Sequence, residues 1–452
     1  MAQLQPQAAP PIRPRGTLWF LVVALLAGHG ARAALDVDRF AVHGQFTYVE
    51  QDTSDFSAPY RGTNSLSPGK GAETTDATVY AGARLWAGAE AWLDLEMDQG
   101  FGLDDTLGVA GFPSAEAYKV GKNQPYLRMP RLFIKQTMDL GGEPVHFDGV
   151  ANVMAADSDA NRLVLTVGKM SVSDIFDTNT YAHNQRADFL NWTAIDAGTF
   201  DYAADSWGYS AGAALEWYQG SWTLRGGVFD LSDIPNSAHL DPGFHEFQID
   251  LEAEKRLELA GKSGKILLTV FDSRGRMGLL NEAVAAAQAN CPVDATCVPD
   301  IAAVRHYRSR IGASLSLEQQ LAPDVGLFGR WGRAGGNVEA YEFTDVDRTA
   351  VAGVSLQGAR WRRADDTLGL TAIVNGISAD RERYLNAGGL GILVGDGKLP
   401  RPGAEQILET YYSIALIHAV HLSFDYQHIV NPAYNRDRGP VSVYAVRLHG
   451  EF

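Results

Sequence analysis

The stretch Val441–Phe452, VSVYAVRLHGEF, ends the chain and decides its fold. Tyr444, Val446 and Phe452 share one parity of this stretch, while Arg447 and Glu451 fall on the other. A period of two is that of a β-strand with one apolar and one polar face. A terminal aromatic residue on such a strand favours an exported β-barrel, in which the apolar face meets lipid and the polar face meets water.

The same alternation recurs along the chain. Near the N-terminal end, Phe46 and Tyr48 alternate with Gln45 and Thr47. We therefore expect an all-β fold, a closed antiparallel transmembrane barrel of about sixteen strands, because an even number brings both ends of the barrel to one side. The predicted strands are 40–50, 74–86, 88–98, 126–140, 161–169, 206–219, 221–231, 244–259, 262–275, 304–320, 323–334, 347–360, 366–376, 405–417, 419–430 and 440–452.

The connections between these strands alternate in length, as short periplasmic turns and long outer loops do in such barrels. The predicted short turns include residues 86–88, 219–221, 260–263 and 321–324, whereas the segments 51–73, 99–125, 170–205, 276–303 and 377–404 are long. Residues 141–160 break this rule, because they are long where a short turn is expected. Asn281–Ala289 has the composition of a short helix within a loop.

Residues 1–33 have the pattern of a secretory signal peptide. Arg13 and Arg15 precede an apolar run from Leu18 to Ala27, and Ala31-Arg32-Ala33 is a small-x-small cleavage site. The alternative is a membrane anchor, for which the apolar run is short. We expect residues 34–452 to form the barrel domain and the chain to be exported to the outer membrane by a Sec-type signal.

The chain is acidic, with 54 Asp and Glu against 38 Lys and Arg and a formal net charge of −16. This charge disfavours nucleic acid as a partner and favours cations over anions in a pore. The sequence contains no H-E-x-x-H motif or phosphate-binding loop, and its match to the G-x-S-x-G pattern, Gly208–Gly212, lies within a predicted strand rather than at a strand-to-helix turn. We therefore expect no enzyme and no cofactor.

An acidic row occupies one face of the third predicted strand, at Glu90, Asp94, Glu96 and Asp98. Side chains two apart on a strand lie about 6.5–7 Å apart on the same face. Such a row would attract cations to the lumen. The alternative is that these carboxylates form salt bridges to cations of neighbouring strands. Candidate partners are Arg84, Arg131 and Lys135.

The long segment 170–205 follows the fifth predicted strand, where general porins fold a loop into the lumen. An inward loop would narrow the pore, and its charged and aromatic side chains suit sugar hydroxyls and apolar sugar faces. The alternative is an ordinary exposed loop. The candidate side chains are Asp174, Asp177, Tyr181, His183, Arg186, Asp188, Trp192 and Asp196.

Histidines and cysteines are the remaining candidates for chemistry. A metal site built from histidines is one hypothesis, and lumen or interface residues are the other. Cys291 and Cys297 lie close together, which favours a disulfide in an oxidising compartment. Metal binding by this pair is the alternative, although its spacing is not that of a zinc site. The histidines concerned are His43, His183, His418, His421, His428 and His449.

The chain resembles the carbohydrate-selective porin family of the OprB type over nearly all of residues 40–452. The resemblance implies a sixteen-stranded barrel that passes sugars or other small hydrophilic solutes, with sugar-contacting Arg and Glu residues at the constriction. The stretch at Cys291–Cys297 departs from the family pattern. The stretches that carry the resemblance are His43–Gln51, the SPG within Ala58–Gly69, Pro130–Gly142, Leu165–Trp192, Ala197–Gln219 and Asn431–Val443.

Gly108–Gly121 and the acidic row also resemble a branch of high-affinity manganese porins. Two functions therefore stay open, namely carbohydrate diffusion and a cation-selective, Mn²⁺-conducting pore. A barrel with a plugged lumen is a third possibility. The expected partners are small hydrophilic solutes and outer-membrane lipid, and the sequence leaves a monomer and a homotrimer open.

Overall fold

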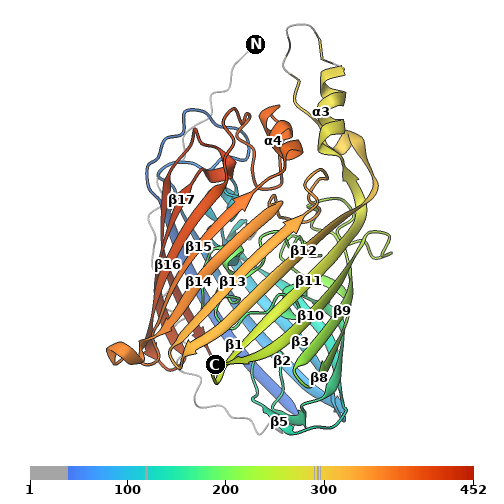
Figure 1. Cartoon of the computed structure of the whole chain (residues 1–452), viewed down its shortest axis with the longest axis vertical. Helices are drawn as coiled ribbons and strands as arrows, with labels where there is room; N and C mark the ends of the chain where they lie inside the picture. The colour runs from blue at the N-terminus through green and yellow to red at the C-terminus, as the bar shows by residue number, and fades with distance from the viewer. Residues whose placement is uncertain (1–38, 118–120, 290, 293–294, 296) are drawn as a thin grey trace. The chain divides into compact units, whose positions relative to one another are not determined.

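The computed structural model describes residues 39–452 except 118–120, 290, 293–294 and 296. The chain divides into two compact units, Met1–Phe40 and Ala41–Phe452. The predicted signal peptide and its cleavage site lie outside the described residues. The second unit contains the barrel (Figure 1).

Sixteen antiparallel strands of the described chain form one closed barrel, as predicted, and each predicted strand overlaps one of them. Around the barrel the order is β1, β18 down to β7, then β4, β3 and β2. The barrel strands are β1 (Phe40–Thr53), β2 (Gly71–Trp86), β3 (Ala89–Gly100), β4 (Lys122–Asp139), β7 (Arg162–Met170), β8 (Ser210–Gln219), β9 (Trp222–Asp230), β10 (Phe247–Leu259), β11 (Lys262–Gly278), β12 (Arg305–Ala322), β13 (Val325–Ala334), β14 (Arg348–Gln357), β15 (Thr367–Gly376), β16 (Glu405–Ile417), β17 (Val420–Val430) and β18 (Val441–Glu451).

The alternation in sequence becomes an alternation in burial. In β18, Val443 and Arg447 are buried, whereas Tyr444 is 54% exposed and Val446 37% exposed. Large apolar side chains are exposed in the same way on strands all around the barrel, from Leu95 of β3 to Phe424 of β17. An outward apolar band and an interior lined by polar side chains are typical of a barrel in lipid.

The barrel closes where the first strand meets the last. Gln45 pairs with Glu451, and Gly44 exchanges two 2.9 Å backbone hydrogen bonds with Phe452. A Cβ atom on Gly44 would lie only 2.2 Å from the Phe452 ring. The glycine therefore makes room for the terminal aromatic ring on the neighbouring strand.

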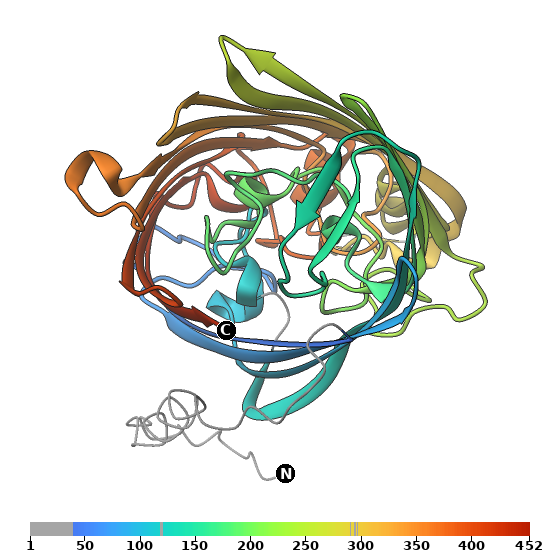
Figure 2. The same ribbon diagram turned by 90° about the horizontal axis from the view of Figure 1, so that it is seen from below.

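One end of the barrel carries short turns, such as residues 87–88, 220–221 and 260–261, and the other carries the long loops. The exception at residues 141–160 has a structural cause. It contains a separate hairpin, β5 (Pro144–Phe147) paired with β6 (Ala156–Asp159), at the short-turn end. Seen from below, this teal hairpin lies across the barrel opening (Figure 2).

The loops hold short helices, and none in the described part of the chain is long and apolar enough to cross a membrane. The helix expected near residues 281–289 is present as α3. The α-helices are α2 (Trp192–Ile195), α3 (Leu280–Ala289) and α4 (Ala379–Asn386). The 3-10 turns are η2 (Leu103–Thr106), η3 (Ala115–Ala117), η4 (Val172–Asp174), η5 (Ala302–Val304), η6 (Gly358–Trp361) and η7 (Pro432–Tyr434).

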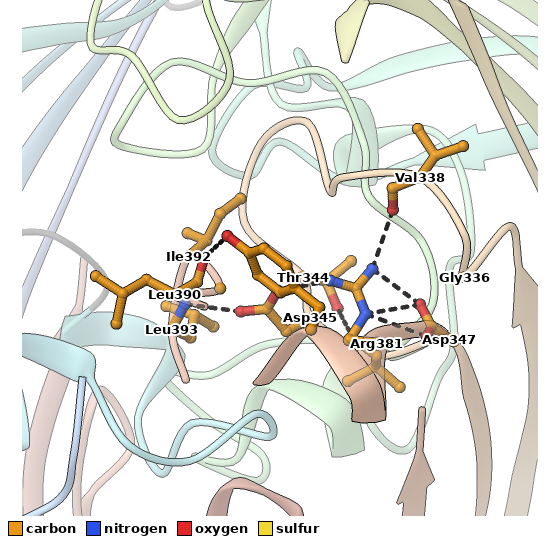
Figure 3. A network of polar contacts seen from close by, with 12 residues as sticks. Gly336, Val338, Thr344, Asp345, Asp347, Arg381, Leu390, Ile392 and Leu393 are labelled. Carbon is orange, nitrogen blue, oxygen red and sulfur yellow. Dashed lines mark hydrogen bonds and ion pairs between the residues drawn. The ribbon is translucent and has the colours of Figure 1, made fainter. Parts of the chain in front are cut away.

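The long loops are tied together by a buried ion-pair network (Figure 3). Arg381 of α4 contacts Asp345 at 3.2 Å and Asp347 at 3.0 Å, and its side chain is only 2% exposed. The amide of Leu393 donates to Asp345 at 2.8 Å, and that of Ser378 donates to Asp347 at 2.8 Å. Two neighbouring loops are thus fastened to each other at the long-loop end.

Candidate functional site

The connection between β7 and β8, residues 171–209, folds into the barrel, as predicted for one loop (Figure 2). Its Phe176 ring lies 6.1 Å from that of Phe229 on β9, and its Phe189 ring lies 4.9 Å from that of Tyr411 on β16. These strands are far apart in the barrel order. The segment, called the inward loop below, therefore crosses the lumen and narrows it.

Carboxylates of the barrel wall hold the inward loop by its backbone. Glu409 of β16 accepts a hydrogen bond from the amide of Leu190 at 2.6 Å, and Glu252 of β10 accepts one from Asp177 at 2.7 Å. Amide groups that enter a lumen need partners, because burying an unpaired one is costly. These wall carboxylates supply the partners.

Arginines of the wall hold the carbonyl groups of the same loop. Arg330 of β13 donates to the carbonyl oxygens of Ala194 at 2.7 Å and Ala182 at 2.8 Å. Arg447 of β18 donates to that of Gln185 at 2.6 Å. Side chains from several strands thus provide hydrogen-bond partners for both the amide and the carbonyl groups of the loop backbone.

The acidic row of β3 lies beside a row of cations on β4. The antiparallel register sets Glu90 opposite Lys135, Asp94 opposite Arg131 and Glu96 opposite Arg128. Every carboxylate of the row has a cationic partner on β4. The ion pairs are Glu90 with Lys135, Asp94 with Arg131 at 3.4 Å, and both Glu96 and Asp98 with Arg128.

Arg186 of the inward loop joins this wall. Its guanidinium lies 2.9 Å from Asp76, 3.0 Å from Glu96 and 2.8 Å from Glu116, and it donates to the Tyr80 hydroxyl at 3.1 Å. Burial alone would lower the pKa of Arg186, but the surrounding carboxylates raise it well above its ordinary value. The group is therefore a fixed positive charge within an acidic surround.

A cavity of about 900 Å³, called the chamber below, lies in the lumen beside this cluster. Its lining combines aromatic rings with charged side chains, which is the composition of sites that bind small polar ligands. The aromatic lining residues are Tyr80, Phe112, Phe133, Trp192, Tyr202, Trp207, Tyr209, Phe343 and Phe452. The charged ones are Glu116, Arg128, Arg131, Lys135, Asp174, Arg186, Asp196, Glu216 and Glu451.

The chamber gathers some of the residues expected from the sequence. Arg131, Lys135, Asp174, His183, Arg186 and Trp192 line it. Arg84, Glu90, Asp94, Glu96, Asp177, Tyr181 and Asp188 are not in its lining. Three of these support the inward loop instead. Asp177 is paired with Arg330 at 3.1 Å, Tyr181 packs on the backbone of Gly326, and Asp188 accepts the amide of His183 at 3.1 Å.

His421 and His449 are paired across β17 and β18, while His43, His183 and His418 line the chamber. His183 contacts Asp196 at 3.4 Å, His43 stacks on Trp92 with ring centroids 6.2 Å apart, and His449 contacts Glu451 at 2.8 Å. Among the residues that the structure describes, no group of three or more His, Cys, Asp or Glu side chains could hold a metal ion.

Cys291 and Cys297 form a disulfide with Cα atoms 5.6 Å apart. They lie between α3 and β12, within a long loop and away from the chamber.

The model of the carbohydrate-selective porin family, OprB family, matches residues 63–452. The chain belongs to this family. Its fold is that of OprB from Pseudomonas putida, whose high-pH structure aligns with a TM-score of 0.69 at 15% identity, over 94% of this chain and 96% of that one. The low-pH structure of the same porin gives 0.50 at 12% identity, over 94% and 98%. No curated protein sequence matches the chain.

The family and the fold are those of outer-membrane channels rather than of enzymes, and this porin passes small solutes. Short turns of such barrels face the periplasm and long loops face outward. The β5–β6 hairpin is therefore at the periplasmic end, and the Arg381 network is at the extracellular end.

Sequence reasoning missed several residues of the chamber and its wall. Arg128 lies on the same face of β4 as Arg131 because of a register irregularity opposite Asp94 and Glu96, and Pro130 is the sequence signal that could have indicated it. Glu116 comes from the loop between β3 and β4. Nothing in its neighbours indicates that this loop also enters the lumen.

Proposed function

We propose that this outer-membrane porin lets carbohydrates diffuse through the chamber, along a path between the inward loop and the β3–β4 wall. The carrying observation is the chamber itself, where aromatic rings and fixed charges line the same space. Aromatic rings stack on the apolar faces of sugars, and ionised groups make strong hydrogen bonds to hydroxyls. Residues 1–33 are proposed as the signal peptide that directs export.

Trp207 is the proposed stacking platform. Its ring is only partly buried, lines the chamber and lies 6.0 Å from the Arg128 guanidinium, while its indole N–H donates to Tyr126 at 3.0 Å. A partly exposed ring that is held at its edge can stack on a sugar ring, while the neighbouring cation binds one of the sugar's hydroxyls.

A planar-bilayer recording of the purified chain tests the function. Glucose or a malto-oligosaccharide should reduce the ion current in a concentration-dependent way. Trp207→Ala should raise the half-blocking concentration about fivefold, which corresponds to about 1 kcal/mol of stacking. Trp207→Tyr should retain most of the block because it keeps a ring. Open channels whose current no sugar reduces would refute the proposal.

The manganese alternative has no support from the comparisons. All four carboxylates of the acidic row form ion pairs with cations of β4, so the row is not an uncompensated line of negative charge. Neutralising Glu90, Asp94 and Glu96 removes the partners of the β4 cations. The mutant channel should therefore become less cation-selective, and this loss alone would not indicate a manganese site. The mass of the purified protein in detergent would distinguish a monomer from a homotrimer.

A further inference from the structure

The connection that holds the β5–β6 hairpin, residues 141–160, is far longer than the other periplasmic turns, most of which have two residues and the next longest of which is 358–366. Its paired strands are in water, since the side chains of the cross-strand partners His146 and Asp157 are 63% and 79% exposed. Its tip, Gly149–Val153, lines the chamber. The hairpin thus runs from the periplasmic rim back into the lumen.

The tip is a turn closed by backbone hydrogen bonds. The amide of Val150 donates to Val153 and that of Val153 donates back, both at 3.0 Å, while Asn152 takes a left-handed backbone conformation with φ 62°. Asparagine is among the few residues other than glycine that adopt this conformation at low cost. The turn therefore presents its residues to the lumen in one defined arrangement.

The wall fixes the tip through groups of β3 and β4. The Asn152 side-chain amide donates to Asp94 at 3.0 Å, and Lys135 donates to the Asn152 carbonyl at 3.0 Å. The backbone amide of Met154 donates to Glu90 at 2.9 Å. The side chain of Met154 is 4% exposed within the lumen's apolar cluster. Polar and apolar contacts thus hold the tip in place.

The hairpin also connects to the inward loop. Asp94 accepts from Asn152 at 3.0 Å and from Arg131 at 3.4 Å, and Arg131 in turn donates to Asp174 of the inward loop at 2.6 and 2.7 Å. One chain of side chains thus joins the two elements that bound the chamber from its outer and periplasmic sides.

We propose that the hairpin tip is the floor of the carbohydrate chamber, a second narrow point that solutes must pass on their way to the periplasm. The inference rests on the proposed function, since it assigns the tip a part in solute selection there. It gives Asp94 and Glu90 a positioning role, because they hold the tip without lining the chamber, whereas Lys135 both holds the tip and lines the chamber. Ala151 lies at the apex of the turn, is exposed and lines the chamber, so it is the tip residue chosen for the labelling test.

Replacing residues 141–160 by an Asn-Gly turn tests the floor. If the inward loop and the tip contribute comparable resistance in series, the single-channel conductance should roughly double, and the sugar concentration for half-block should rise. An unchanged conductance in correctly folded channels would overturn the inference. Sugar block in the parent channel together with unchanged conductance in the short variant would remove the floor and leave the proposed function standing.

A labelling experiment keeps the full chain. Both native cysteines are in the disulfide, so an introduced thiol is the only target for a charged methanethiosulfonate reagent. Ala151→Cys should lose current when the reagent is added on the periplasmic side, because the bulky charged adduct raises the resistance at the tip, and about a threefold rise there would halve the current. Val145→Cys is the matched control, since it is exposed on the same hairpin but is not in the chamber lining. Equal responses of the two variants would contradict the inference.

Discussion

Arg381→Met should loosen the extracellular loops in a manner that depends on pH. Figure 3 shows the guanidinium between Asp345 and Asp347, and the Arg381 side chain is almost wholly buried. Methionine fills a similar volume but leaves Asp345 without a cation and Asp347 with only Arg310, at 3.8 Å. Breaking a buried pair from one side typically costs about 3–5 kcal/mol, because an uncompensated charge remains.

The same magnitude follows from protonation. To stay buried without Arg381, a carboxyl must take up a proton, which at pH 7 costs about 4 kcal/mol for an ordinary pKa near 3.9. At pH 4.5 the cost falls to about 1 kcal/mol. Burial already raises the pKa of Asp345, against the effect of Arg381, so this residue is the first to protonate. The defect should therefore shrink as the pH falls.

The parent protein should behave differently in the same range. Burial would raise the pKa of Asp347, but Arg381 outweighs it and holds that pKa below its ordinary value. A lowered carboxyl pKa contributes stability above the unfolded pKa of about 3.9, and this stability is lost only as the pH falls through the folded value. The parent loops should thus stay closed at pH 4.5.

Hydrogen exchange provides the assay. The amides of Leu393 and Ser378 donate to the two carboxylates, so they report loop opening directly. In the variant, their protection at pH 7 should drop by up to about a thousandfold, and at pH 4.5 by about fivefold after correction for intrinsic rates. Arg383→Met, on the exposed face of the same helix, should leave both amides unchanged. Parent-like protection at pH 7, or a loss equally large at pH 4.5, would refute the reasoning.

Three further outcomes are expected. Arg186→Gln removes the fixed cation among three buried carboxylates, so the reversal potential in a salt gradient should shift toward cations; an unchanged potential would place this cluster outside the ion path. Gly44→Val sets a branched side chain where the Phe452 ring packs, so less heat-modifiable, folded barrel should appear on gels, while normal yield would show that the ring moves freely. Replacing both Cys291 and Cys297 by Ser should leave conductance and sugar block within error, because the pair lies away from the chamber; a changed conductance would contradict this.

The barrel was predictable because its signal is local. Each strand carries its own alternation, as in β18, where Tyr444 and Val446 face out and Val443 and Arg447 face in. The inward loop could also be placed from its position after the fifth strand. The hairpin at 141–160 was visible only as an anomaly, since nothing within it indicates that its tip folds back into the lumen.

The candidate site was harder to predict because its contacts join residues far apart in sequence. The acidic row was identified by parity, but its pairing with Arg128 depends on a register shift between β3 and β4. Asp201 offered no sequence signal at all. It accepts amide hydrogen bonds from Tyr341 and Phe343 and pairs with Arg310 at 2.7 Å, which only the folded chain brings together.

The anchoring of the inward loop by wall carboxylates and arginines has an evolutionary consequence. Glu409, Glu252 and Arg330 grip amides and carbonyls, which every residue type except proline offers alike. Mutations along the loop can therefore replace the side chains that contact a solute, while the path of the loop backbone across the lumen is preserved. Solute preference can therefore change through substitutions in the inward loop, while the wall residues that anchor this loop stay the same.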